Sequence, residues 1–218
     1  TMSRIIILLT LIAGAARVHL VPNNARTKNV TGELTLVQRE DNFIEITGKI
    51  YGLTPGLHGI HVHEKGDLRH GCMSTGPHFN PENVTHGGQN SSVRHVGDLG
   101  NILAKENGDA DVNIKDSIIS FIGNNNIIGR AIVIHSGEDD LGRGSSPLSA
   151  STGNSGDRWA CGIIKELARI LEYCLPIVHM IAFGFDEHVP FQLDELYLIF
   201  LILLSPVMLV KILEPCQL

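Results

Sequence analysis

The chain has 218 residues and a formal net charge of −6, which argues against a nucleic-acid-binding protein held by phosphate contacts. Hydrophobic residues make up 43% of the sequence and aromatic residues only 5%, with 23 glycines, which favours one loop-rich β domain over a helical bundle. The 11 histidines direct attention to metal-ligand spacing.

The first sixteen residues have the features of a secretory signal peptide. Arg4 supplies the positive charge, residues 5–13 form an apolar run too short to span a bilayer, and residues 13–16 offer small side chains for cleavage. A buried first strand or helix is the alternative. Three sequons agree with the secretory pathway and are candidate glycosylation sites: Asn29, Asn83 and Asn90. We therefore predict a secreted protein with a signal peptide over 1–16.

Short strand-like segments dominate the sequence up to residue 164. Within 17–63, β-branched residues with partial alternation predict strands at 31–38, 43–51 and 57–63. The same pattern resumes at 98–104, 110–114, 117–122 and 130–135, and Asn107-Gly108 indicates a tight turn between two of these segments. Two long loops, 64–97 and 136–157, interrupt the strands, and loops of such length are usually functional. We expect an antiparallel β-sandwich or barrel.

The character of the sequence changes after residue 164. Residues 165–174 are compatible with a helix, and residues 196–210 form an uncharged apolar run that is shorter than a usual membrane span, contains Pro206 and precedes Lys211. The tail 165–218 is therefore membrane-associated through 196–210, a buried helix, or non-native sequence from a wrong gene model, and we favour the last. Cys174 and Cys216 receive no role.

Two histidines in a strand-like segment begin a series of metal-ligand candidates. His61 and His63 are two residues apart, so both side chains leave the same face of the strand. The other candidates follow in the first long loop or at a strand end: His78, His86, His95, Asp98 and His135. Six histidines and one aspartate can fill two metal sites if one ligand is shared. Neutral imidazole suits copper and zinc, and one carboxylate is a common zinc ligand.

The sequence around these residues resembles the copper/zinc superoxide dismutase family. The shared motifs are GLHGIHVHE at 56–64, GPHFNP at 76–81, HGG at 86–88, RHVGDLGN at 94–101, GRAIVIH at 129–135 and GNSGDRWACG at 153–162. The resemblance covers about residues 17 to 164. It implies a secreted enzyme with a Greek-key β-sandwich or barrel domain over 17–164, two long functional loops and a homodimeric assembly.

The resemblance also implies a role for each motif residue. It implies the copper ligands His61, His63, His78 and His135. It implies the zinc ligands His78, His86, His95 and Asp98, so that His78 bridges the two metals. Asp139 would link the two sites from outside, and outer partners of this kind orient ligand imidazoles. Cys72 and Cys161 would form a disulfide.

The implied reaction is the disproportionation of superoxide to oxygen and hydrogen peroxide. Copper would change oxidation state, zinc would be structural, His78 would supply a proton, and Arg158 would guide the anion to copper. Ser151 stands where many members have lysine, so we expect steering to depend mainly on Arg158. Trp159 is also bulkier than the usual residue at its position.

A non-catalytic, chaperone-like copper- and zinc-binding domain of the same fold is the alternative function. Such relatives commonly lack a copper ligand or the arginine, and neither is missing here. The remaining histidines match no ligand position: His19, His58, His70, His179 and His188.

Overall fold

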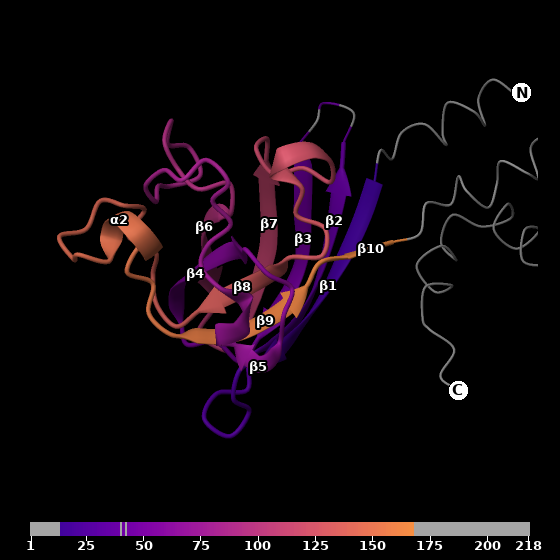
Figure 1. The fold of residues 1–218 in the computed structure, drawn as a ribbon. Coiled ribbons are helices and arrows are strands. Elements are labelled where there is room, and N and C mark those ends of the chain that lie inside the picture. Colours follow the sequence, from indigo (N-terminus) through magenta and orange to yellow (C-terminus); the bar gives the residue numbers. More distant parts are fainter. Residues whose placement is uncertain (1–13, 40, 42, 168–218) are drawn as a thin grey trace, which may run out of the picture. The chain divides into compact units, whose positions relative to one another are not determined.

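Antiparallel strands account for nearly all the regular structure in the computed structural model, which describes residues 14–39, 41 and 43–167 (Figure 1). The strands are β1 (Gly14–Pro22), β2 (Thr31–Gln38), β3 (Ile44–Tyr51), β4 (Gly56–His63), β5 (Arg69–Cys72), β6 (Asp98–Ala104), β7 (Ala110–Asp116), β8 (Ala131–His135), β9 (Arg158–Ile163) and β10 (Lys165–Glu166). The helical elements are short: η1 (Met73–Thr75), η2 (Gly123–Asn125) and α2 (Ser149–Thr152).

Nine of these strands form a nearly closed barrel with crossover connections, and β5 lies outside it. Their order is β6-β4-β8-β9-β1-β2-β3-β7, with β10 paired to β1, and every pairing is antiparallel. The two end strands, β6 and β7, are consecutive in the chain and are joined through Gly108, which adopts the positive φ of 84° that the tight turn requires. The predicted antiparallel Greek-key β fold is confirmed.

Burial along the strands shows how the sequence positions the site. On β2 it alternates, because Leu34 and Leu36 face the core while Glu33 and Thr35 face solvent. On β4 it is almost continuous, although the side chains still alternate between the two faces. Ile60 and Val62 enter the core, whereas His61 and His63, which alternate with them, face the opposite side, where the long loops cover the sheet.

One predicted strand is wrong. Residues 117–122 form bends and an isolated bridge that lead into η2, because the Asp116 carboxylate accepts hydrogen bonds from the backbone N–H groups of Ile118 (2.8 Å) and Ile119 (3.0 Å). A side-chain acceptor of this kind offers the backbone an alternative to the ladder. The two long loops are loops as expected, although the first contains β5 and η1 and the second contains α2.

The first predicted boundary of the domain falls inside a paired strand, and the second falls between β9 and β10, which both pair with β1. β1 begins at Gly14, and Ala16 of the predicted signal peptide pairs with Leu36 of β2 and is fully buried. Ala16 also pairs with Glu166 of β10, so the predicted helix over 165–174 is wrong at its first two residues, and the rest of it lies outside the described residues. The apolar run at 196–210 lies outside them too. Among the described residues, none of the helices is long and apolar enough to cross a membrane.

The predicted disulfide is present. Cys72, at the end of β5, is bonded to Cys161 on β9, 89 residues away. The bond ties the first long loop to the barrel wall, and the two cysteines pack with Val133 in a small buried cluster.

Cys72→Ser should lower the melting temperature of the protein by about 10 °C. Closing a loop of this length removes unfolded-state entropy worth about 4–5 kcal/mol, and each kcal/mol shifts Tm by roughly 2–4 °C in a protein of this size. Differential scanning calorimetry of the metal-free protein measures the shift. In a strong reductant the two proteins should converge, and equal melting temperatures under oxidising conditions would contradict the prediction.

Candidate metal centre

The seven predicted ligands come together beside the β4–β8 pair. β4 carries His61 and His63, β8 ends at His135, and the remaining four ligands lie in the first long loop or at the start of β6. All seven are buried, with 5% exposure or less. Their donor atoms form two clusters in which all donors lie within 4.8 Å of one another: His61, His63, His78 and His135, and then His78, His86, His95 and Asp98.

In the first cluster, hydrogen bonds hold the outer nitrogen of each unshared imidazole. His63 Nδ1 donates to the carbonyl of Gly76 at 2.8 Å, and His135 Nδ1 lies 3.3 Å from the carbonyl of Gly156. His61 Nε2 donates to the Asp139 carboxylate at 2.8 Å. These bonds fix the tautomers, so that His61 Nδ1, His63 Nε2 and His135 Nε2 present lone pairs to the cluster.

The second cluster has three imidazole nitrogens and one carboxylate. Asp98 Oδ1 lies 2.9, 3.0 and 3.1 Å from Nδ1 of His78, His86 and His95. The Nδ1 atoms of His78 and His95 are 3.4 Å apart, which matches the roughly 3.3 Å edge of a tetrahedron whose metal–ligand bonds are about 2 Å. This donor set and spacing suit zinc.

His78 is shared by the two clusters. Its Nδ1 lies in the second cluster, whereas its Nε2 is buried and has no hydrogen-bond partner among the described residues, and the same is true of His61 Nδ1. Leaving buried polar atoms unpaired costs about 1–3 kcal/mol each. Both atoms point into the first cluster, so a bound copper ion would satisfy them, and the residues present therefore fit the metal.

A buried carboxylate joins the two clusters from outside. Asp139 is fully buried; its Oδ2 accepts from His61 Nε2 and its Oδ1 accepts from His86 Nε2, both at 2.8 Å. Oδ1 also accepts the backbone N–H of Leu141 at 2.7 Å. The side-chain amide of Asn101 binds both the backbone N–H and the carbonyl of Asp139, each at 2.8 Å. The backbone and both carboxylate oxygens of Asp139 are therefore held in place.

Burial keeps the first cluster neutral. Desolvation, helped by the neighbouring imidazoles, lowers the pKa of His61 and His63 well below the usual value and lowers that of His135 to about 3. His86 behaves differently. Burial alone would lower its pKa, but the carboxylates of Asp139 and Asp98 raise it to about 9. Metal ligation requires neutral imidazole, so the first cluster is already in its ligating form at neutral pH.

Arg158 begins β9 directly opposite His135. Its guanidinium is half-buried and donates from one nitrogen to the carbonyl of Cys72 at 2.9 Å and to Thr75 Oγ1 at 3.1 Å. Its positive charge is among the causes that lower the pKa of His63 and His135. The disulfide-bonded loop thus places a permanent cation beside the first cluster.

The other residues singled out from the sequence lie around this centre. Ser151 is exposed on α2, and Trp159 packs against the barrel core with Lys28 Nζ 4.6 Å from its ring centre. His58 is buried and its Nδ1 donates to the carbonyl of His135 at 2.9 Å, whereas His19 and His70 are exposed. The three sequon residues are exposed: Asn29, Asn83 and Asn90. His179 and His188 lie outside the described residues.

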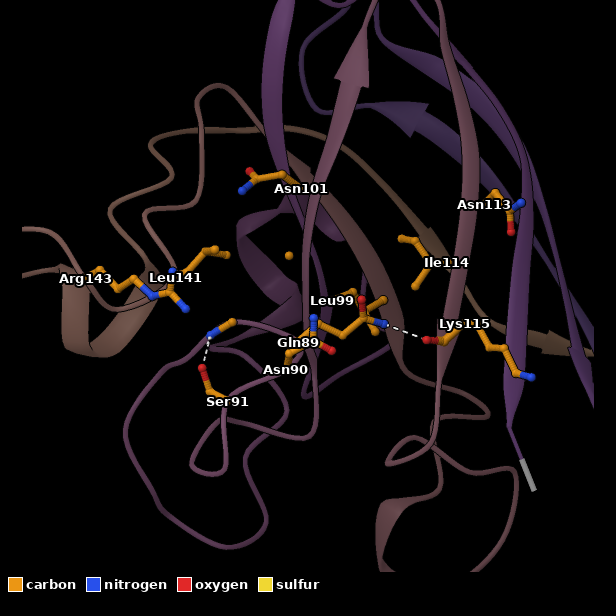
Figure 2. A pocket seen from close by; sticks show the side chains of 12 residues that line it. Gln89, Asn90, Ser91, Leu99, Asn101, Asn113, Ile114, Lys115, Leu141 and Arg143 are labelled. Carbon is orange, nitrogen blue, oxygen red and sulfur yellow. Dashed lines mark hydrogen bonds between the residues drawn. The ribbon is translucent and has the colours of Figure 1, made fainter. Parts of the chain in front are cut away.

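Two residues that bind Asp139 also line a pocket of about 350 Å³ (Figure 2). Asn101 and Leu141 line it, together with Asn90, Arg143 and others, and none of its lining residues is a histidine. The chemistry-bearing groups are therefore in the buried histidine clusters and outside this pocket.

Sequence reasoning missed two residues that support the clusters. Asn101 holds Asp139, and the buried Arg94 donates to the backbone carbonyl of Asp98 and to Asp116, the latter at 2.6 Å. Both residues lie within the RHVGDLGN motif, beside the ligands, and the placement of polar residues next to ligands was the available signal.

Comparison with known proteins settles the family. The family model described as copper/zinc superoxide dismutase matches residues 30–164, which include every residue of both clusters. The chain belongs to the copper/zinc superoxide dismutase family. The predicted activity on superoxide and the predicted cofactors, copper and zinc, are thereby confirmed.

Similar proteins come from distant organisms. The chain is 46% identical over 186 residues to the extracellular Cu-Zn superoxide dismutase of Haemonchus contortus, covering 77% of this chain and all of that protein. It is 54% identical over 140 residues to Cu-Zn superoxide dismutase 3 of Arabidopsis thaliana, covering 64% of this chain and 85% of that protein. The crystal structure of the clock protein EA4 is similar with a TM-score of 0.66 and 46% identity, covering 71% of this chain and 95% of that one.

Proposed function

We propose that the two histidine clusters carry the superoxide dismutase reaction with separate roles. His61, His63, His78 and His135 hold copper, and His78, His86, His95 and Asp98 hold zinc. The observation that supports this assignment is the position of His78, whose two ring nitrogens belong to different clusters while its Nε2 is buried without a partner among the described residues. Copper, when bound, supplies the one-electron chemistry that oxidises one superoxide and reduces the next.

His78 is the proposed proton carrier. Its Nε2 faces the first cluster, while Asp98 Oδ1 lies 2.9 Å from its Nδ1 and keeps the ring in place. Nε2 would hold either copper or a proton, so a proton taken up while Nε2 is free of the metal would lie beside the position where peroxide forms, and a fixed ring would deliver it without reorientation. Arg158 attracts and orients the anion, because its guanidinium is permanently charged and retains donors beyond the nitrogen that binds the loop.

The second cluster, with zinc, fixes the loop that carries His78. The ion pair between Arg94 of this loop and Asp116 of β7 also holds the loop against the barrel, and both side chains are almost completely buried. Asp139 is proposed as the link that orients His61 and His86 together. In this arrangement zinc takes no part in electron transfer, because it has no accessible second oxidation state.

The purified protein should contain about one copper and one zinc per chain, because both ligand sets are complete. Inductively coupled plasma mass spectrometry measures the metals, and a superoxide assay measures turnover in the same sample. Zinc alone after copper loading, with no turnover, would favour the non-catalytic metal-binding alternative over the enzyme.

We propose that the protein is secreted, as the name of its extracellular relative suggests, with a cleaved leader at the N-terminus. The exposure of all three sequon asparagines supports glycosylation on the secretory route. Since Gly14 and Ala16 pair with β2, a mature chain that retains them would keep β1 at full length. The intact mass of the mature protein, before and after deglycosylation, should show loss of the leader and added glycan. An unprocessed, unmodified mass would contradict secretion.

The homodimer and the membrane contact through 196–210 stay predictions. Sedimentation of the mature protein in buffer and in detergent tests both predictions. A homodimer should have twice the mass of one chain in either solution, whereas a protein bound to membranes through 196–210 should need detergent to stay in solution.

A further inference from the structure

We propose that Gly153 is a positioning residue for the zinc site, because the absence of a side chain there allows the Asp139 carboxylate to reach His86. The inference rests on the roles of Asp139 and His86 proposed above. Glycine has no side chain, so Gly153 neither binds a metal nor forms a side-chain hydrogen bond to Asp139 or His86.

The backbone at Gly153 is held on both sides. It caps the C-terminus of α2 with φ 63° and ψ 16°, and its N–H donates to the carbonyl of Ser149 at 3.1 Å. Its carbonyl accepts the N–H of Asp140 at 2.8 Å. The segment therefore cannot move away from Asp139 without breaking one of these two hydrogen bonds.

A side chain at position 153 would enter the Asp139–His86 hydrogen bond. A Cβ built there would lie 2.5 Å from His86 Nε2 and closer still to Asp139 Oδ1, whereas real Cβ atoms essentially never approach other atoms within 3.0 Å. The two atoms it would strike are the donor and the acceptor of a 2.8 Å hydrogen bond between fully buried side chains.

The carboxylate has no room to yield. Oδ1 is also bound by the N–H of Leu141 at 2.7 Å, Oδ2 is bound by His61, and Asn101 holds the backbone of Asp139 in both directions. A new methyl group must therefore displace either His86 or the carboxylate. Displacing either one breaks the bond that keeps the proton on His86 Nε2 and leaves Nδ1 free for zinc.

A glycine at this position could serve the positive φ of the backbone or the lack of space for a Cβ, and these two explanations can be separated. Glycine is favoured at positive φ whatever its surroundings, but asparagine also tolerates this conformation. Gly153→Asn therefore largely keeps the backbone and still introduces the Cβ. Gly129 is the matched control, because it has φ 78° and a Cβ there would meet nothing within 4 Å, so Gly129→Ala imposes the backbone penalty alone.

The experiment measures zinc binding by the metal-free full-length chain in competition with a chromophoric chelator. Cobalt(II), which reports the geometry of a zinc site through its visible spectrum, is the second probe. Gly153→Ala and Gly153→Asn should each weaken zinc binding about 10–100-fold, as loss of an outer hydrogen bond to a ligand does, and should alter the cobalt spectrum. Gly129→Ala should lower the melting temperature and leave both readouts unchanged.

Zinc binding by Gly153→Asn that equals the parent protein would overturn the proposal, since the glycine would then serve only the backbone conformation. An equal loss in Gly129→Ala would overturn it as well, because general destabilisation would account for the effect. If the parent protein itself binds neither zinc nor cobalt, the proposed zinc site is wrong, and that result is distinguishable from a failure at Gly153.

Discussion

His61→Ala should lose copper and reduce superoxide turnover by about a hundredfold or more, while zinc content stays near one per chain. Removing a residue that hydrogen-bonds to a metal ligand already costs 10–100-fold in metal affinity or activity, and removing the ligand itself should cost at least as much. His61 belongs to the copper cluster alone, its Nδ1 is one of the buried atoms without a hydrogen-bond partner among the described residues, and its Nε2 is bound by Asp139. Metal analysis and pulse radiolysis on the same sample measure the effect.

Asp98→Ala is the matched comparison for His61→Ala. It removes the carboxylate that contacts the three zinc-cluster imidazoles and leaves the four copper-cluster residues unchanged. Zinc should be lost while copper is retained. The two variants should thus show opposite metal losses, and loss of zinc alone from His61→Ala would disprove the division of ligands.

Arg158→Glu should reduce the second-order rate with superoxide by about ten- to a hundredfold at low salt, with unchanged copper and zinc content. Charge in a cleft changes the association rate of an ion by about 10–10³-fold, and this substitution reverses the sign of a cation beside the copper cluster. Arg158→Lys should lose less, since it keeps the charge but cannot reproduce the paired contacts to Cys72 and Thr75.

Salt supplies an independent check on the role of Arg158. The rate of the parent protein should fall as ionic strength rises, because screening shortens the reach of exposed charge, and Arg158→Glu should lose that dependence. Ser151→Lys adds a cation at an exposed position of α2 and should raise the low-salt rate if α2 borders the substrate path. A rate and salt dependence in Arg158→Glu equal to those of the parent would place Arg158 outside that path.

The strands and the gathering of the candidate ligands were predictable, and part of the signal for each is local. Alternation at 31–38 and the two-residue spacing of His61 and His63 follow directly from strand geometry. The residues alone give no such signal for the partner of the second imidazole nitrogen. Asp139 is 78 residues from His61 and 53 from His86, so its role as a link was expected from the family resemblance alone, and the folded chain shows that it binds both.

The errors have the same origin. The apolar residues at 117–122 satisfy a strand pattern, but the Asp116 side chain accepts hydrogen bonds from the backbone N–H groups of Ile118 and Ile119. β10 was not expected, because a two-residue strand carries no periodic signal and exists only through its pairing with Ala16 and Arg17. Gly153 is one of 23 glycines, and its importance depends on a carboxylate that reaches it through tertiary structure.

In the proposed arrangement, the carboxylate of Asp139 would make the two metal sites thermodynamically interdependent. It binds one imidazole of each cluster, so a metal that changes the charge on one imidazole would alter the hydrogen bond that the carboxylate makes to the other. Linkage then requires strict reciprocity: the factor by which bound zinc would change the affinity for copper equals the factor by which bound copper would change the affinity for zinc. Any substitution that removes the link through Asp139 would bring both factors closer to one, whichever metal is measured.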